Sequence, residues 1–414
     1  MNKTRLPLSD EYRKLCRGEL ADPYPEYRRL RDSDPVHWSE GFNGWLVTRY
    51  VDVHAALKDS RLPSGGRLDS YMGSLPSAAL KELQPLRNHY ATWLVNLDPP
   101  DHTRLRTLVS KAFTPRMVDH LRTFIKSAAD ELLSSWSPGD GIDFVSRFAR
   151  PLPARVIAKL LGIKPEESAQ FERWSEEISA FQGTGKPQVA LAERAQAAVE
   201  AMSEFVRQLL DRRRAKPIGD LLGELVSVEE RGERLQEHEL VGMAVFLLVA
   251  GHETTMSLLA NGLLALVRNP DQFDRLRAEP DLMPSAIEEF LRFDSPLQHQ
   301  VRAARDDMVI ANVPIGREDR VVIMLGAANR DPAQFPDPDR LDVGRSPNQH
   351  LAFGLGTHYC LGAPLARLEG QIAFQSLLEQ FSEIRLCESN IVWRRHTSMR
   401  NPEQLQVEVC RDRN

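Results

Sequence analysis

Apolar residues recur along most of this chain with the spacing of an amphipathic helix. The 3.6-residue period dominates from 101 to about 161, and two further long helical patterns follow at about 165–181 and 189–214. Strict alternation is confined to short segments such as 45–48 and 405–409, which predict a small amount of sheet. The pattern therefore predicts a mainly α protein with minor β structure.

Glycine, proline and serine interrupt this pattern in places. After a predicted helix, small sheet and helix in 22–61, they become frequent from 62 to 93. That stretch predicts an irregular segment, either a surface loop or a flexible wall over a pocket. The connector 183–187 is typical of a mobile tip between two helices. No internal repeat or low-complexity linker divides the sequence, so we expect one large domain over residues 1–414.

The longest apolar run, 240–267, is long enough to cross a membrane. Its middle, which reads A-G-H-E-T-T at 250–255, places a polar band where a bilayer would be driest. A long helix buried through a soluble core fits this pattern better than a membrane span.

Composition narrows the function classes. The 414 residues carry a formal net charge of -5, so neither nucleic acid nor an anionic membrane is expected as the main partner. The N-terminus lacks the apolar stretch of a signal peptide or membrane anchor. The scattered cysteines Cys16, Cys360, Cys387 and Cys410 do not form a disulfide framework, which favours a reducing, cytoplasmic setting.

One cysteine has unusual neighbours. Residues 353–362 read F-G-L-G-T-H-Y-C-L-G, an almost uncharged loop that opens onto a helical pattern. A buried cysteine is most often a small apolar residue. A dinucleotide loop fails because Tyr359 replaces the third glycine, and a zinc site lacks a second nearby cysteine. The fourth interpretation is a thiolate ligand to haem iron, which the amides of a helix N-terminus would favour.

Other segments indicate chemistry more weakly when judged alone. Gly251 removes a side chain, so a flat ligand could lie against its helix, while Thr254 can divert a backbone hydrogen bond and open the helix locally. Glu253 followed by this alcohol makes a short proton relay; the plainer alternative is a kinked core helix with Glu253 paired elsewhere. Glu289 and Arg292, spaced i,i+3, would usually form a solvated salt bridge.

The cysteine loop and its neighbours resemble the cytochrome P-450 monooxygenases. Residues 353–369 match F-G-x-G-x-H-x-C-L-G-x-x-L-A-R-x-E position for position, and 250–255 match A-G-x-[D/E]-T-T. The resemblance runs in order from about residue 22 to the C-terminus. It implies a single large, mainly α domain with minor β, a long central helix over haem b and a cysteine-ligand loop on the proximal side.

The resemblance also implies a role for each motif residue. Cys360 would bind the iron, Thr254 would hydrogen-bond the bound oxygen, and Glu253 would help to deliver protons. Further cofactor-binding residues would border the O2 site, contact the haem propionates or belong to the cysteine loop; these are Ala250, Gly251, His102, Arg106, Arg302, His358, Phe353 and Gly362.

A structural role is implied for the pair Glu289 and Arg292, which resembles the E-x-x-R motif of the family. In the family this pair joins a third basic residue and braces the cysteine loop. Arg340, which ends the P-D-R segment 338–340, is the candidate for that third residue.

The implied function is insertion of one oxygen atom from O2 into a small organic substrate. Hydroxylation or epoxidation is expected, in secondary metabolism or in xenobiotic, terpenoid or fatty-acid oxidation. An H2O2-using peroxygenase, an oxidative-coupling P-450 and a non-enzymatic haem sensor are the alternatives, and the pair Glu253-Thr254 favours O2. We expect a cytoplasmic monomer with no fused reductase, which receives electrons from a separate ferredoxin and ferredoxin reductase.

Four stretches carry no family-wide pattern and are expected to face the substrate. They are 62–93, 171–190, 297–300 and 397–399. The identity of the substrate stays open.

Overall fold

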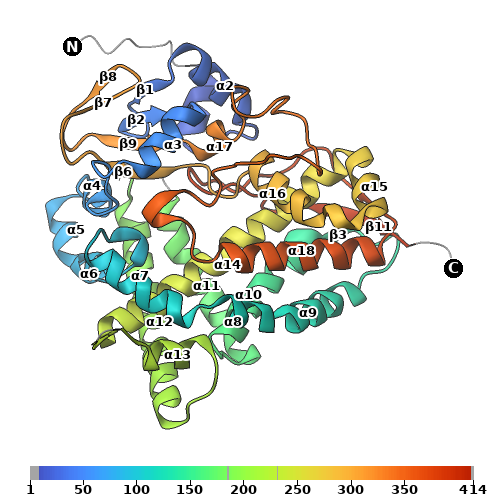
Figure 1. The fold of residues 1–414 in the computed structure, drawn as a ribbon, viewed down its shortest axis with the longest axis horizontal. Helices are drawn as coiled ribbons and strands as arrows, with labels where there is room; N and C mark the ends of the chain where they lie inside the picture. The colour runs from blue at the N-terminus through green and yellow to red at the C-terminus, as the bar shows by residue number, and fades with distance from the viewer. Residues whose placement is uncertain (1–8, 184–185, 231, 412–414) are drawn as a thin grey trace.

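The structure, a computed structural model, describes residues 9–183, 186–230 and 232–411. Part of the connector that is expected to be mobile, residues 184 and 185, therefore lies outside the described residues. The prediction of a mainly α protein with minor β structure is confirmed. Figure 1 shows helices forming most of the molecule, with β1, β2 and β6 to β9 beside the N-terminal helices and β3 and β11 near the C-terminus.

The elements have the following bounds. The α-helices are α1 (Asp10–Cys16), α2 (Tyr24–Ser33), α3 (Tyr50–Lys58), α4 (Arg67–Met72), α5 (Ser77–Glu82), α6 (Gln84–Tyr90), α7 (Asp101–Ala112), α8 (Pro115–His120), α9 (Arg122–Ser134), α10 (Pro151–Leu160), α11 (Ser168–Gln182), α12 (Val189–Ala215), α13 (Leu221–Ser227), α14 (Glu237–Val267), α15 (Pro270–Ala278), α16 (Met283–Phe293), α17 (Leu325–Ala328) and α18 (Ala363–Gln380). Shorter 3-10 or π turns are η1 (Leu94–Asn96), η2 (Val145–Ala149), η3 (Pro165–Glu167), η4 (Pro280–Leu282) and η5 (Gly356–His358). The strands are β1 (Val36–Ser39), β2 (Gly44–Val47), β3 (Ile142–Asp143), β4 (Glu229–Glu230), β5 (Glu233–Arg234), β6 (Gln300–Ala303), β7 (Met308–Ile310), β8 (Val313–Ile315), β9 (Arg320–Ile323), β10 (Glu383–Leu386) and β11 (Gln406–Cys410).

The largest sheet joins segments that are far apart in sequence. Its strand order is β1-β2-β9-β6. Strands β1 and β2 form an antiparallel hairpin, β2 runs parallel to β9, and β9 runs antiparallel to β6. The helix, small sheet and helix expected in 22–61 are present as α2, β1 with β2, and α3. This arrangement places strand β9 against the N-terminal hairpin, with β6 on the other side of β9.

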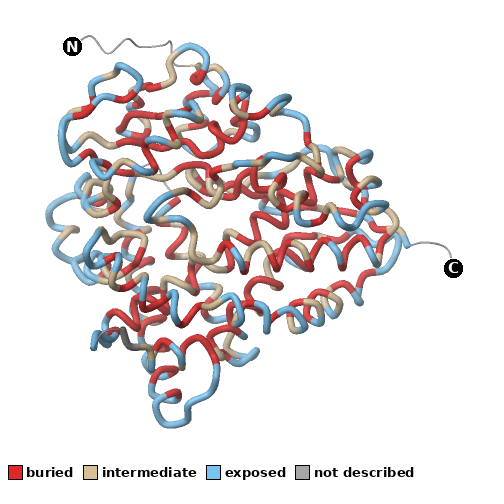
Figure 2. The backbone as a smooth tube through the Cα atoms, viewed as in Figure 1, coloured by how far each residue is buried: buried red, intermediate tan, exposed pale blue. Residues whose placement is uncertain are grey.

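Helix α14 runs through the centre of the helical region. It packs against α10, α12, α16 and α18, and Figure 2 shows buried backbone through the middle of the molecule. Among the described residues α14 is the one helix long and apolar enough to cross a membrane, but 78% of its most apolar window is buried inside the protein. This burial agrees with the predicted core helix. In its first turn, Glu239 accepts a hydrogen bond from the Gln236 amide and pairs with Arg104 of α7.

The expectation of an irregular stretch at 62–93 is wrong in part, because α4, α5 and α6 lie within it. Glycine and proline set the ends of these helices instead of preventing them. Gly66 precedes α4 with a φ of +79°, Pro76 precedes α5, and Pro85 lies in the first turn of α6, where its fixed φ is compatible with a helix. Of these short helices, α6 packs against α12 and α4 packs against β6.

A buried carboxylate links α16 to the segment before the cysteine loop. Glu289 accepts two hydrogen bonds from Arg292, at 2.7 and 2.8 Å, and two from the Nε of Arg345, both at 3.1 Å. The Glu289 and Arg292 side chains are both 0% exposed. The third basic residue is therefore Arg345, and the prediction of Arg340 is wrong. Arg340 is exposed and contributes its backbone carbonyl, which accepts from Arg292 at 3.3 Å.

We expect Glu289→Gln to lower the free energy of unfolding by about 3–5 kcal/mol, because it leaves two guanidinium groups without their buried counter-charge. Urea unfolding followed by circular dichroism measures the change. Arg122→Gln is the control, since Arg122 forms an exposed pair with Asp119 at 3.2 Å, and such pairs contribute little. Equal stabilities of the two variants would contradict a bracing role for Glu289.

Candidate functional site

The cysteine loop is fixed by its glycines and by one backbone hydrogen bond. Gly354 and Gly356 have φ angles of +68° and +71°, in the left-handed region that glycine adopts without strain. A Cβ on Gly356 would also lie 3.2 Å from the Leu57 carbonyl oxygen. The amide of Cys360 donates to the Phe353 carbonyl at 3.0 Å. The loop therefore holds Cys360 just before the first turn of α18.

Cys360 lines a cavity of about 280 Å³ between its loop and α14. Burial raises the pKa of the Cys360 thiol above its usual value, although hydrogen bonds from the Gly362 and Ala363 amides and the charge of Arg106 lower it. The amides alone thus do not outweigh burial, contrary to the simple expectation from a helix N-terminus. A thiolate here would be stabilised by a cation at the sulfur, as metal ligation provides.

Helix α14 contributes Ala250, Gly251 and Thr254 to the wall of this same cavity. The hydroxyl of Thr254 donates to the Ala250 carbonyl at 2.9 Å, and α14 is one continuous helix. The expected local opening of the helix is therefore wrong for this structure. A Cβ on Gly251 would lie 3.0 Å from Cδ1 of Ile157, so this glycine also permits close packing of α14 against α10.

Glu253 is buried and already has partners. Its carboxylate accepts hydrogen bonds from the hydroxyl of Ser179 and from Arg394, the latter at 3.3 Å. The plainer alternative, a glutamate paired elsewhere, describes this geometry. Among the described residues no hydrogen bond joins Glu253 to Thr254 directly, so the expected relay is not preassembled here.

Basic side chains converge beside the cysteine cavity. The four that the sequence identifies, His102, Arg106, Arg302 and His358, come from α7, β6 and the cysteine loop. The His102 and His358 rings lie 4.3 Å apart between centroids. His102 is 1% exposed, and neither of its nitrogens has a partner in the part of the chain that the structure describes. Arg106 donates to the Tyr359 carbonyl at 2.6 Å, next to Cys360.

Arg67 of α4 joins this group, and sequence reasoning missed it. Its Nε donates to Asn96 at 2.7 Å. Burial, and then the charge of Arg302, lower the pKa of Arg67 to about 9. No spacing rule pointed to Arg67, because it is brought to the site by the packing of α4 against β6, which is far away in the sequence.

Burial lowers the pKa values of these basic groups, and for some of them the neighbouring positive charges lower the pKa further. Burial lowers the pKa of Arg302 to about 10. Burial, and after it the charges of Arg302, His102, Arg67 and Arg106, lower the pKa of His358 to about 3. Three arginines and two imidazoles therefore lie close together, and Asp98 is the carboxylate whose charge acts on Arg67, Arg302 and His102. The positive charges outnumber this one carboxylate. Such an arrangement favours an anionic ligand that accepts hydrogen bonds.

These features fit haem. Cys360 provides a sulfur at the cavity wall, and α14 contributes Ala250 and Gly251 to the same cavity. The unpartnered nitrogens of His102, together with the basic cluster, suit two propionates. Phe353 lines the same cavity, with Arg367 stacked 4.6 Å from its ring centre. Gly362 lines it as well, and a Cβ there would be 3.9 Å from the Cys360 sulfur.

Glu369 of α18 contributes a carboxyl group to this cavity, and the family resemblance implies no separate role for it. Burial raises its pKa well above the usual value. Its Oε2 has no hydrogen-bond partner among the described residues.

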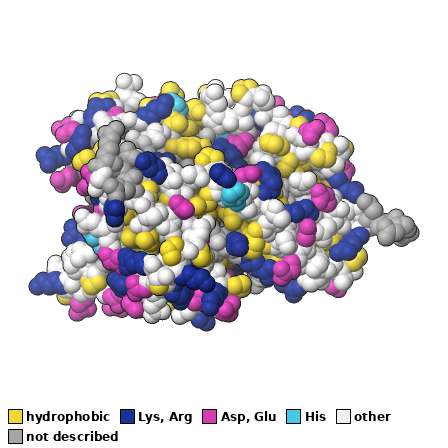
Figure 3. Space-filling model, turned by 60° about the horizontal axis from the view of Figure 1, so that its bottom comes forward, with side chains coloured by type: hydrophobic (Ala, Val, Ile, Leu, Met, Phe, Trp, Pro, Cys, Tyr) yellow, Lys and Arg dark blue, Asp and Glu magenta, His cyan; other side chains and the backbone are white. Residues whose placement is uncertain are grey.

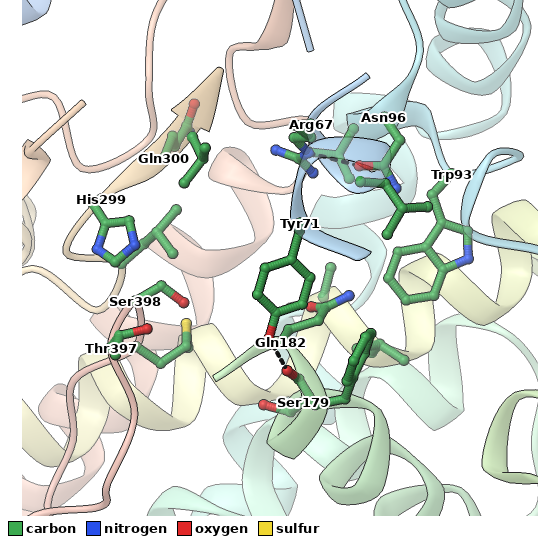
Figure 4. A pocket seen from close by; sticks show the side chains of 18 of the residues that line it. Arg67, Tyr71, Trp93, Asn96, Ser179, Gln182, His299, Gln300, Thr397 and Ser398 are labelled. Carbon is green, nitrogen blue, oxygen red and sulfur yellow. Dashed lines mark hydrogen bonds between the residues drawn. The ribbon is translucent and has the colours of Figure 1, made fainter. Parts of the chain in front are cut away.

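A second cavity of about 300 Å³ adjoins the first and shares Ala250, Thr254 and Gln300 with it. All four stretches expected to face the substrate contribute to its wall (Figure 4). The contributing residues are Arg67, Leu68, Tyr71, Tyr90 and Trp93, then Ser179, Phe181 and Gln182, then Leu297, His299 and Gln300, and finally Thr397, Ser398 and Met399. In Figure 4 His299 and Trp93 lie on opposite sides of this cavity.

Comparison with known proteins gives a consistent result. The cytochrome P450 family model matches residues 78–409. The 6-deoxyerythronolide B hydroxylase of Saccharopolyspora erythraea is 40% identical over 396 residues, covering 94% of this chain and 96% of the relative. The mycinamicin IV hydroxylase/epoxidase of Micromonospora griseorubida is 40% identical over 394 residues, covering 94% and 95%. A crystal structure of P450BioI with hexadec-9Z-enoic acid ligated acyl carrier protein superposes with a TM-score of 0.88 at 33% identity, covering 97% and 100%.

The packing role of Gly251 can be measured by a double-mutant cycle with Ile157. Gly251→Ala alone should change stability little, because up to about 1 kcal/mol of helix propensity is offset by the clash with the Ile157 methyl group. In an Ile157→Val background that methyl is gone, and Gly251→Ala should stabilise by about 0.5–1 kcal/mol. Urea unfolding of the wild type, the two single variants and the double variant gives the coupling free energy between positions 251 and 157. Additive changes would show that Ile157 does not restrict this position.

Proposed function

The chain belongs to the cytochrome P450 family, and from this premise we propose that Cys360 and the basic cluster hold haem b between the cysteine loop and α14. The protein is a monooxygenase that hydroxylates or epoxidises organic substrates. The single observation that supports the site best is that Cys360 and residues of α14 line one cavity. When bound, haem supplies reductive activation of O2 and transfer of one oxygen atom.

Each residue of the site then has a task set by its position. His102, Arg302 and His358, with Arg67, present hydrogen-bond donors to the propionates, and Arg106 also ties α7 to the cysteine loop through the Tyr359 carbonyl. Ala250 and Gly251 leave room on the distal wall because their side chains are small. These contacts orient the cofactor before the substrate enters.

Proton delivery is assigned to Glu253 and Thr254. Thr254 lines both cavities, whereas Glu253 lines only the second. When Glu253 takes up a proton from solvent and leaves Arg394 and Ser179, its carboxyl group can pass that proton to the Thr254 hydroxyl, directly or through one water. A peroxygenase would not require this pair, so the pair favours O2 over H2O2 as the oxidant.

The substrate is a small organic molecule, and electrons come from a redox partner. We assign the substrate to secondary metabolism because two relatives are named for macrolide-type hydroxylation and epoxidation. A separate ferredoxin with its reductase, a cytoplasmic location and a monomeric state complete the proposal, with residues 1–414 as one domain. On the face in Figure 3, Lys and Arg are interspersed with Asp and Glu, which gives no large single-sign field there for nucleic acid.

Reduction by dithionite under CO tests the iron ligand. The wild-type protein should show the red-shifted Soret band of a haem thiolate. Cys360→His should retain some haem but lose that band together with monooxygenase activity. Cys387→Ser is the control, since Cys387 is an exposed free thiol, and its spectrum should match the wild type. A normal band in Cys360→His would rule out Cys360 as the ligand.

Arg67→Gln should release haem to apomyoglobin about tenfold faster than the wild type, because it removes a charge-assisted hydrogen bond to a propionate. Arg87→Gln provides the comparison. Arg87 lies in the same segment and forms an exposed pair with Asp69, so its loss should leave the transfer rate unchanged. Identical rates for both variants would remove Arg67 from the cofactor cluster.

A further inference from the structure

A second arginine in the substrate cavity has no counter-charge. Arg320 of β9 lines the cavity of about 300 Å³. Its Nε is buried without a hydrogen-bond partner. The guanidinium group forms no hydrogen bond or ion pair with any residue in the described ranges 9–183, 186–230 and 232–411. Because arginine stays charged in proteins, the wall of this cavity carries an unmatched positive charge.

The carboxylates nearest to this arginine along the chain and in the cavity are already engaged. Asp319 accepts hydrogen bonds from the Trp45 indole at 2.8 Å and from the Gly316 amide at 3.0 Å. Glu253, on the α14 side of the cavity, pairs with Arg394 and Ser179. Neither carboxylate therefore neutralises Arg320.

Arg320 also differs from the cations assigned to the cofactor. Burial and the charge of Arg302 affect Arg67 most, and both these arginines influence His358. The charge of Arg320 instead influences His299, which lines the substrate cavity together with Arg320. The register of β6 and β9 explains why the two arginines act in different regions. Arg302 pairs with Val321, and Arg320 pairs with Ala303. Because successive side chains of a strand point to opposite faces and paired residues point to the same face, Arg302 and Arg320 extend from opposite faces of the sheet.

The surroundings of Arg320 suit a planar anion at the end of an apolar molecule. His299 is neutral, because burial and Arg320 lower its pKa to about 3, and its Nδ1 has no partner among the described residues. A guanidinium beside an imidazole offers N–H donors to both oxygens of a carboxylate. The rest of the wall is largely apolar or aromatic, with Trp93, Phe246 and Val249.

We propose that Arg320 anchors a carboxylate of the substrate, so that this enzyme oxidises an amphipathic organic acid. The proposal rests on the function proposed above and narrows its substrate class. The carboxylate binds at the β9 wall, the apolar body lies along Trp93 and Phe246, and the carbon to be oxidised extends toward Thr254 on α14. A single free guanidinium matches one negative charge, which favours a monocarboxylate over a phosphate.

Soret titration of the holoenzyme tests the proposal with two matched ligand pairs. These are dodecanoic acid with methyl dodecanoate, and abietic acid with methyl abietate. In the wild type at least one acid should bind about tenfold or more tightly than its ester. Arg320→Gln should abolish that preference by weakening the acid and leaving the ester unchanged, and Arg320→Lys should retain part of it.

Arg317→Gln is the matched control, because Arg317 lies three residues before Arg320, in the turn that leads into β9, with its side chain 72% exposed. This variant should keep the wild-type preference. Equal affinity for acid and ester in the wild type overturns the proposal, as does a preference that survives in Arg320→Gln or the absence of any shift with both acids. If Arg320→Gln does not fold, the acid and ester affinities of the wild type and of Arg320→Lys test the proposal.

The reduced CO spectrum is recorded first on each preparation. Loss of the thiolate band would refute the proposed function, whereas a normal band without acid preference refutes only the carboxylate anchor.

Discussion

The position of the cysteine loop depends on one fully buried carboxylate. Glu289 gathers Arg292, Arg345, the Asp342 amide and the Asn348 side chain around its two oxygens. Desolvation makes such a group unfavourable unless all its partners are present, so the segment before the loop can settle in few arrangements. Cys360 can share a cavity with α14 because the chain leading to it is fixed from behind.

The cluster around Glu289 and the cavities differ in how far positive charges are matched by acceptors. Around Glu289 each cation has a carboxylate or carbonyl partner, whereas His102, Arg67 and Arg302 meet with little to neutralise them. A folded protein tolerates such crowding where a bound ligand supplies the missing acceptors. The contrast separates the residues that hold the fold from those that hold the cofactor, a distinction that the residue types alone do not make.

Local patterns predicted the fold well wherever contacts are local. The apolar run 240–267 identified α14 to within a few residues, and the motif at 353–362 identified the loop that carries Cys360. Predictions failed where the contacts of a residue depend on a segment that is distant in the sequence. Arg345 takes the role expected for Arg340 because the path of the chain before the cysteine loop, and not the sequence spacing, determines which side chain reaches Glu289. Thr254 stays within a continuous helix although its hydroxyl donates to the Ala250 carbonyl.

Arg67 and Arg320 illustrate why the substrate side was hardest to predict. Arg320 faces its cavity only because β9 pairs with β2 and β6, which are separated from each other by about three-fifths of the chain. In this sheet successive side chains point to opposite faces, so Arg302 of β6 and Arg320 of β9 lie on different faces. One face then serves the region of His358 and the other serves the second cavity. Topology, which no single-residue pattern encodes, thus assigns otherwise similar arginines to different ligands.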